Sequence, residues 1–287
     1  MEGRLTFLGT GTSMGVPTLG CDCAVCTSAD PRDRRLRPSV LVRWKATGQD
    51  SGLPPLRREE TARMGHGSSG AGRERVVIID TGPDFREQAL RTRLNHVDAV
   101  LYTHAHADHI LGLDDLRPLS FATFRAGGPV LLYASRQTAQ VLERIFDYHF
   151  SSESTYPTRA RARLELLGER VRIHEAEFTC VPVKHGDMDI AGFRFGDTAY
   201  LTDVSDIPES SFPLLEGLNT LVLPSLRHHP HPSHATVKQA VEWAERIGAR
   251  QTWLTHIAHE LGHEVTNRML PPGVALAYDG LEVAVNL

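Results

Sequence analysis

The stretch His104-Ala105-His106-Ala107-Asp108-His109 decides the fold of this chain. It follows an apolar run at residues 97–103, which predicts a buried strand. Three imidazoles and one carboxylate so close together cannot share one helical face, but they can converge if the backbone turns sharply after the strand. Packing gives no reason to gather such side chains, whereas His and Asp together suit divalent metal ions. The stretch therefore predicts a metal site at a strand end.

Three later apolar segments also end in potential metal ligands. These ligands are His185, Asp203 and His256. Together with the four from the first stretch, they exceed what one tetrahedral zinc requires. Two adjacent metals would use them all, and paired metals drive water onto a phosphorus or carbonyl centre. The sequence therefore predicts a hydrolytic centre with two metals.

The overall composition excludes several classes of protein. Apolar residues make up 41% and charged residues 23%, which is typical of a soluble globular chain with a substantial core. The net charge of −4 argues against a strongly nucleic-acid-binding surface. Residues 1–7 lack the apolar core of a signal peptide, and no apolar run approaches transmembrane length. We therefore expect a cytoplasmic protein without membrane contact.

Short strands alternate with helical stretches along most of the chain. This pattern predicts an α/β (α+β) fold of two packed sheets covered by helices, in one domain over residues 1–287. Residues 46–74 are rich in Gly, Ser, Arg and Glu, which predicts a flexible, solvent-exposed insertion. Residues 236–247 predict an amphipathic helix. Residues 275–285 predict a terminal hairpin that turns at Asp279.

Three of the four cysteines, Cys21, Cys23 and Cys26, are crowded near the start of the chain. In a reducing compartment this crowding favours metal binding over a disulfide. His259, three residues after His256, completes a Cys3His set of the kind found in closed structural zinc sites. Such a zinc would fix the irregular N-terminal loop to the catalytic scaffold. Three unpaired thiols or a Cys21–Cys26 disulfide are the alternatives.

These motifs resemble the metallo-β-lactamase superfamily of hydrolases. The matching residues, in the family's order, are Asp80, the His-x-His-x-Asp-His motif at residues 104–109, His185, Asp203 and His256. The resemblance spans nearly the whole chain and implies the four-layer αββα sandwich of that superfamily.

A closer resemblance lies in the N-terminal loops and near the C-terminus. The segments at residues 9–17, 21–26 and 255–259 are similar to those of bacterial phosphodiesterases that hydrolyse phosphoribosyl 1,2-cyclic phosphate. This likeness implies a metal-dependent phosphodiesterase for a small cyclic sugar phosphate or a similar phosphodiester. It also implies a homodimer.

The resemblance further implies a role for each ligand. The implied ligands are His104, His106 and His185 for one metal, Asp108, His109 and His256 for the second, and Asp203 as the bridge between them. Asp80 would orient the His-rich loop, because a ligand imidazole needs an acceptor for its second nitrogen. An ordinary capping Asp at a strand end is the alternative for Asp80. His and Asp ligands admit Zn²⁺, Mn²⁺, Fe²⁺ or Ni²⁺, and we expect Zn²⁺ or Mn²⁺.

The implied reaction uses a hydroxide that bridges the two metals and attacks phosphorus in line with a sugar oxygen. Asp108 and Asp203 would take part as metal ligands. His234 matches the family's late histidine and would protonate the leaving oxygen or hold the phosphate. A surface histidine at a helix start is the alternative for His234. The histidines without such a match are assigned to the surface: His228, His229 and His231.

Other functions fit the sequence less well. A tRNA 3′-processing endonuclease would share the loop at residues 9–11 and His234, but the chain is acidic and lacks an obvious basic RNA-clamping arm. A β-lactamase is disfavoured because Asp203 stands where those enzymes usually have cysteine. A glyoxalase-type thioester hydrolase would lack the cysteine loop. A non-catalytic accessory protein, like those of pyrroloquinoline quinone synthesis, has no need for the intact ligand set.

Overall fold

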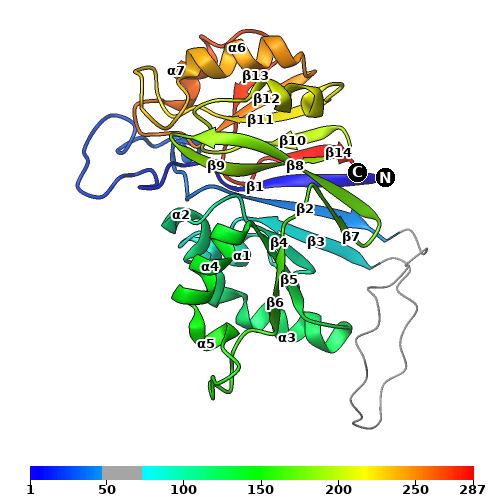
Figure 1. The fold of residues 1–287 in the computed structure, drawn as a ribbon. Helices are drawn as coiled ribbons and strands as arrows, with labels where there is room; N and C mark the ends of the chain where they lie inside the picture. Colours follow the sequence, from blue (N-terminus) through cyan, green and yellow to red (C-terminus); the bar gives the residue numbers. More distant parts are fainter. Residues whose placement is uncertain (47–72) are drawn as a thin grey trace.

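Two seven-stranded β-sheets stack face to face, and helices cover the outer face of each sheet (Figure 1). The computed structural model describes residues 1–46 and 73–287. The first sheet contains, in spatial order, β14 (Glu282–Asn286), β1 (Glu2–Gly9), β2 (Ser39–Lys45), β3 (Glu74–Ile79), β4 (Ala99–Leu101), β5 (Val130–Ala134) and β6 (Ala162–Leu166). The second contains β13 (Val274–Leu276), β12 (Gln251–Thr255), β11 (Thr220–Pro224), β10 (Thr198–Tyr200), β9 (Met188–Phe195), β8 (Ala176–His185) and β7 (Arg170–Ile173).

The helices divide between the two outer faces. The first sheet is covered by α1 (Phe85–Arg91), α2 (Ala107–Ile110), α3 (Leu116–Ala126), α4 (Arg136–Ile145) and α5 (Asp147–Phe150), and the second by α6 (Val237–Ile247) and α7 (His263–Asn267) (Figure 1). Short 3-10 turns lie at Pro31–Asp33, Leu113–Asp115 and Glu209–Leu215. The predicted αββα sandwich is therefore confirmed. No helix in the described ranges is both long enough and apolar enough to span a membrane.

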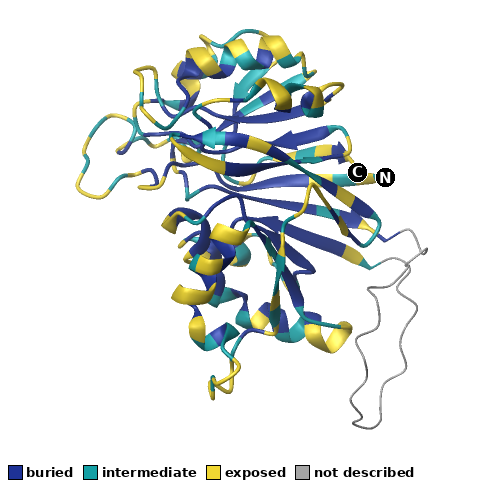
Figure 2. Cartoon of the chain, in the orientation of Figure 1, coloured by how far each residue is buried: buried dark blue, intermediate teal, exposed yellow. Residues whose placement is uncertain are grey.

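Aromatic side chains join the two sheets. Trp44 on β2 contacts Phe178 on β8 with ring centroids 6.4 Å apart, and Phe178 contacts Phe195 on β9 at 5.4 Å. All three are buried, in a core formed by both sheets. Figure 2 shows the buried strands between the exposed outer faces of the helices. Burial of such rings holds the sheets together and so fixes the strand ends relative to one another.

The predicted helix near the C-terminal third is confirmed as α6. Thr236 caps its start by accepting a hydrogen bond from the Gln239 backbone, and the Gln239 side chain accepts one from the Thr236 backbone in return. Gly248 ends the helix in the left-handed conformation, with φ of 70°. The firm start of α6 matters because His234 lies only two residues before the cap.

The predicted terminal hairpin is wrong. β13 belongs to the second sheet and β14 to the first, so the chain crosses between the sheets at Asp279 instead of folding back. The buried Asp279 carboxylate accepts hydrogen bonds from the backbone and hydroxyl of Thr10, at 2.9 and 2.8 Å, and from the Leu36 backbone at 2.8 Å. These partners, which are distant in the sequence, hold Asp279 at the crossover between the sheets. The prediction of a hairpin used only the local turn residues and could not take them into account.

The predicted insertion at residues 46–74 falls almost entirely outside the described residues. At its edges, the Ala46 backbone N–H donates to the Arg73 carbonyl at 3.0 Å, and Glu74 already belongs to β3. The strand pairing therefore reaches slightly further into this segment than the sequence predicted.

The two ends of the chain lie side by side. β1 and β14 pair in antiparallel fashion from Glu2 opposite Asn286 onward. The N-terminal amino group donates to the Leu287 carbonyl at 2.9 Å. Figure 1 shows both termini at the edge of the sandwich opposite α2.

Candidate metal centre

The His-rich stretch turns sharply between β4 and α2. His104, Asp108 and His109 are buried there, whereas His106 is exposed. The Thr81 backbone N–H donates to the His109 carbonyl at 2.8 Å, which ties this turn to the loop after β3. Gly82 lies in that loop so close to the turn that an added Cβ would stand 2.1 Å from the Asp108 carbonyl oxygen. The close approach therefore requires glycine.

Asp80 fixes the orientation of His109. Its carboxylate lies 2.7 Å from His109 Nδ1, and both side chains are fully buried. Thr103 adds a backbone N–H at 2.9 Å and a hydroxyl at 2.8 Å to the same carboxylate. With Nδ1 engaged, the Nε2 atom of His109 faces the other acidic side chains. These contacts support the predicted orienting role of Asp80 over that of an ordinary cap.

Asp203 lies between two imidazoles. One of its oxygens is 3.1 Å from His109 Nε2 and the other is 3.0 Å from His256 Nε2. Asp108 approaches the same nitrogens, at 3.2 Å from His109 and 3.8 Å from His256. These four buried residues form one candidate metal-binding group.

His104, His106 and His185 form a second candidate group beside the first. Their ring centroids are 4.5 to 5.4 Å apart. His104 Nδ1 contacts the Thr103 hydroxyl at 3.0 Å, and His185 Nδ1 donates to the Ser233 carbonyl at 2.7 Å. In both rings Nε2 is thus the nitrogen left to bind a metal.

The donor atoms fit divalent metals. The ligand atoms of each group lie within 4.8 Å of one another, and two ligands of one tetrahedral zinc stand roughly 3.4 Å apart. Among the described residues, the buried Nε2 atoms of His104, His109 and His256 have no hydrogen-bond partner of good geometry. Buried polar atoms rarely lack a partner, so an ion that accepts their lone pairs would complete the centre.

The electrostatics of the centre also call for positive charge. Burial opposes charge on His256, yet the Asp203 and Asp108 carboxylates raise the pKa of His256 to about 9. Burial likewise opposes charge on His109, but Asp203, Asp80 and Asp108 raise its pKa well above the usual range. The negative charge of these carboxylates can be balanced either by protons on the two imidazole rings or by divalent metals. Metal binding would therefore displace those protons.

Three residues of the centre have a left-handed backbone. The φ angles are 64° at Asp80, 58° at Asp203 and 54° at His256. Asp80 and His256 directly follow β3 and β12, and Asp203 lies just past β10. Such conformations cost about 1–3 kcal/mol each and concentrate at functional sites. The unusual φ turns each of these side chains away from the alternation of its strand.

His234 lies against both groups. Its ring centroid is 4.7 Å from that of His256, almost parallel, and 4.6 Å from that of His185. Its Nδ1 atom is 3.7 Å from an Asp203 oxygen. Burial, and after it the positive charge of His256, lowers the pKa of His234 to about 3, so the free ring is neutral. Because His185, Asp203 and His234 also form a candidate group, the geometry allows His234 to be a ligand as well as an acid.

The cysteine loop forms a separate candidate site with His259. The Nδ1 atom of His259 lies 3.2, 3.4 and 3.6 Å from the sulfurs of Cys21, Cys23 and Cys26. Sulfur and nitrogen ligands of one tetrahedral zinc stand roughly 3.5 Å apart. The Cys26 backbone N–H donates to the Cys23 sulfur, and mainly this bond lowers the pKa of Cys23 to about 6. That shift favours the thiolate, which is the form that binds metal.

Comparison with known proteins identifies the family. The Beta-lactamase superfamily domain matches residues 75–257, which is more than half of the chain and contains every predicted active-site ligand. The chain belongs to the metallo-β-lactamase superfamily. A solved diphosphatase from the PhnP family is 47% identical, with a TM-score of 0.83, and the match covers 99% of this chain and 98% of that one. This chain is therefore a metallo-β-lactamase superfamily hydrolase of the PhnP type, as predicted.

The chain spans about half the length of the curated relatives it matches. An octanoyltransferase from Porphyromonas gingivalis is 33% identical over 287 residues, which are 99% of this chain and 52% of that protein. A ribonuclease Z from Bradyrhizobium diazoefficiens is 28% identical over 158 residues, which are 53% of this chain and 49% of that protein. Because these relatives are about twice as long as the part that this metallo-β-lactamase superfamily member matches, their names do not establish its activity.

The structure places one further histidine next to His234. His231, assigned to the surface, lies only partly exposed beside His234, with ring centroids 4.9 Å apart. His228 and His229 are exposed, as expected. The short segment from His231 to His234 could have signalled the contact, because it places two imidazoles just before a well-capped helix.

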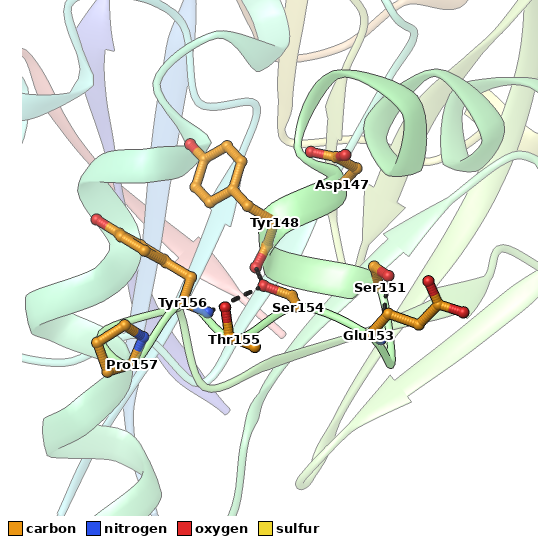
Figure 3. Close-up of a pocket in the computed structure, with 8 residues that line it drawn as sticks. All are labelled: Asp147, Tyr148, Ser151, Glu153, Ser154, Thr155, Tyr156 and Pro157. Carbon is orange, nitrogen blue, oxygen red and sulfur yellow. Dashed lines mark hydrogen bonds between the residues drawn. The ribbon is translucent and has the colours of Figure 1, made fainter.

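A separate pocket of about 500 Å³ lies at α5 and the turn that follows it (Figure 3). It is lined by Asp147, Tyr148, Ser151, Glu153, Ser154, Thr155, Tyr156 and Pro157. The Tyr156 hydroxyl accepts a hydrogen bond from Arg117 at 2.6 Å, and the Tyr148 hydroxyl donates to Asp114 at 2.8 Å. Because both hydroxyls are engaged and the lining includes no residue of the metal groups, we assign this pocket no part in the metallo-β-lactamase centre.

Replacing Asp80 with asparagine should lower turnover by about 10–100-fold, the usual cost of losing a partner of a ligand histidine. Asparagine keeps the shape and tolerates the left-handed backbone, but it removes the charge that fixes His109. Turnover and bound metal should be measured together. Unchanged values for both would make Asp80 an ordinary cap.

Replacing Cys23 with serine should remove one zinc per chain and lower thermal stability. If the lost ligand costs a few kcal/mol, the midpoint of unfolding should fall by roughly 5–10 °C. Elemental analysis and calorimetry would measure the two effects. Cys180 lies apart from this site, so Cys180→Ser is the matched control. An unchanged zinc count in the Cys23 variant would exclude the Cys3His site.

Proposed function

We propose that this protein hydrolyses a small phosphodiester, such as a cyclic sugar phosphate, at a centre built for two divalent metals. The observation that supports this most strongly is the convergence of the buried Nε2 atoms of His109 and His256 on the two oxygens of Asp203, at 3.1 and 3.0 Å. Carboxylates and imidazoles buried this closely together require compensating positive charge, which divalent metals would supply.

The proposed centre divides its ligands between two metals. One metal would be held by His104, His106 and His185, the other by Asp108, His109 and His256, with Asp203 as the bridge. Bound Zn²⁺ or Mn²⁺ would supply the Lewis acidity that polarises a phosphoryl oxygen and activates water at neutral pH. A third zinc would be held by Cys21, Cys23, Cys26 and His259 with a structural role.

The chain's own residues would position the ligands and move protons. Asp80 and Ser233 hold the rings of His109 and His185, so less reorganisation is needed when substrate binds. His234 lies beside Asp203 and would face the scissile bond. Because an anionic phosphodiester raises the pKa of a neighbouring imidazole, substrate binding itself would help to protonate His234. The protonated ring would then donate its proton to the leaving oxygen.

Hydrolysis of a diphosphate bond is a second candidate. It is favoured by the 47% identity to a diphosphatase over nearly the full length of both chains. Both reactions are in-line displacements at phosphorus, so the same residues would serve either one. A tRNA-processing role is less well supported, because the net charge is −4 and the ribonuclease Z match covers about half of each chain.

The decisive test is turnover of bis-p-nitrophenyl phosphate by protein reconstituted with Mn²⁺ or Zn²⁺. A 2′,3′-cyclic nucleotide and a dinucleoside diphosphate should be assayed beside it. Hydrolysis of the first two would support the phosphodiesterase, and preference for the third would support the diphosphatase. A fully metal-loaded protein that hydrolyses none of them would redirect the assignment to thioester hydrolysis or an accessory role. The predicted homodimer can be checked by light scattering of the same sample.

A further inference from the structure

We propose that His231 binds the substrate next to the reacting phosphorus, by donating its Nε2–H to an anionic oxygen of a second phosphoryl group. This inference rests on the proposed function and deepens its second candidate, the hydrolysis of a diphosphate bond, because it names a residue that would bind the second phosphoryl group. The proposal is carried by the contacts of the segment before α6.

Imidazole rings form a row that leads outward from the metal groups. The buried His256 contacts His234 at 4.7 Å between centroids, and His234 contacts His231 at 4.9 Å. His231 is the outermost of the three and is only partly exposed. A substrate whose scissile bond lies at His234 would therefore present its neighbouring group to His231. In a diphosphate, that neighbouring group is a second phosphoryl.

The backbone of Ser233 sets the tautomer of His231. The Ser233 N–H donates to His231 Nδ1 at 3.3 Å, so Nδ1 must act as the acceptor. The neutral ring then carries its proton on Nε2 and offers one donor. The carbonyl of the same Ser233 accepts from His185 Nδ1 at 2.7 Å. One peptide segment thus orients a metal ligand and His231 together.

The loop that carries His231 is held in place. Arg227 donates from Nε to the His229 carbonyl at 3.2 Å and from Nη2 to the Pro230 carbonyl at 3.1 Å. The same guanidinium lies 3.6 Å from the Glu260 carboxylate, next to the cysteine-site ligand His259. A backbone held in this way keeps His231 beside His234, so less ordering of the loop is needed when the ring binds an anion.

The test compares His231→Ala with His229→Ala. His229 lies in the same loop but is exposed, and its contact to Arg227 comes from the backbone, so its side chain is a matched control. His231→Ala should raise the KM for a dinucleoside diphosphate by about 10-fold or more, as expected for one hydrogen bond to a charged group. The kcat, the metal content and the turnover of bis-p-nitrophenyl phosphate should change little. His231→Gln, which retains a side-chain N–H, should restore part of the loss.

Binding provides a readout that does not depend on turnover. A dinucleoside diphosphate with a methylene bridge should bind the metal-loaded protein about 10-fold more weakly after His231→Ala and equally well after His229→Ala. If the wild-type protein binds this probe through His231 but hydrolyses no phosphorus ester, the proposed function fails and the binding role of His231 stands. If hydrolysis occurs but both variants match the wild type in KM and in binding, the role of His231 is overturned and the proposed function stands.

Discussion

Replacing Asp203 with alanine should lower phosphodiester turnover by about 10³-fold or more, the scale expected when a group that organises the transition state is lost. It should also reduce the metal bound at the active site. Asp203 is the residue whose two oxygens separately contact His109 and His256. Without it, both imidazoles lose their nearest shared counter-charge, and the candidate metal-binding group of Asp108, His109, Asp203 and His256 loses one ligand. Turnover and metal content should therefore fall together, and both can be measured on one preparation.

Two further variants make this result interpretable. Asp203 has a φ of 58°, where alanine is strained but asparagine is tolerated, so Asp203→Asn separates loss of charge from loss of folding. Asp206 lies three residues further on, exposed to solvent, and Asp206→Ala should behave like the wild type. Full activity in the folded Asp203→Asn and Asp203→Ala proteins would refute the bridging assignment.

Replacing His234 with alanine should lower turnover by about 10²–10⁴-fold, the contribution typical of a general acid, while leaving metal content unchanged. His234 lies 3.7 Å from Asp203 and packs on His256, so it is close enough to reach a substrate bound at the centre. Its pKa, lowered to about 3 by burial and by His256, makes the free ring neutral. A neutral ring can take up a proton, and the negative charge of the bound substrate would stabilise this protonated form.

The metal content of this variant distinguishes the two roles that the geometry allows. His185, Asp203 and His234 lie close enough together to hold an ion. If His234→Ala loses a metal along with its activity, His234 is a ligand and the leaving oxygen takes its proton from elsewhere. Substrates with a p-nitrophenolate leaving group need little protonation, so for them the loss of turnover should be smaller than for a sugar-oxygen leaving group.

The site was largely predictable because its residues follow apolar strands directly. Asp80 and His256 each come immediately after the last residue of a strand, where local pattern reveals both the strand and the polar residue that ends it. Asp203 could be found in the same way, close behind β10. The order of these residues along the chain then pointed to the superfamily and to its sandwich fold.

The features that could not be predicted depend on partners far apart in the sequence. The crossover at Asp279 is held by Thr10 and Leu36, 269 and 243 positions away, so the local turn signal favoured a hairpin instead. The position of His231 depends on its loop, which is held by the contact between Arg227 and Glu260. Hydrophobic periodicity in the sequence does not predict such a contact. β6 lies at the edge of its sheet, and each of its residues is partly or fully exposed. Its sequence therefore shows little of the hydrophobic alternation by which a strand is predicted.

The adjacent chain ends have a consequence for how this fold can be joined to other modules. Figure 1 shows them at the edge of the sandwich opposite α2, the helix that carries Asp108 and His109. A module fused to either end would therefore begin at the edge of the sandwich opposite α2. The same edge is the place to attach a tag or a surface anchor when activity has to be preserved.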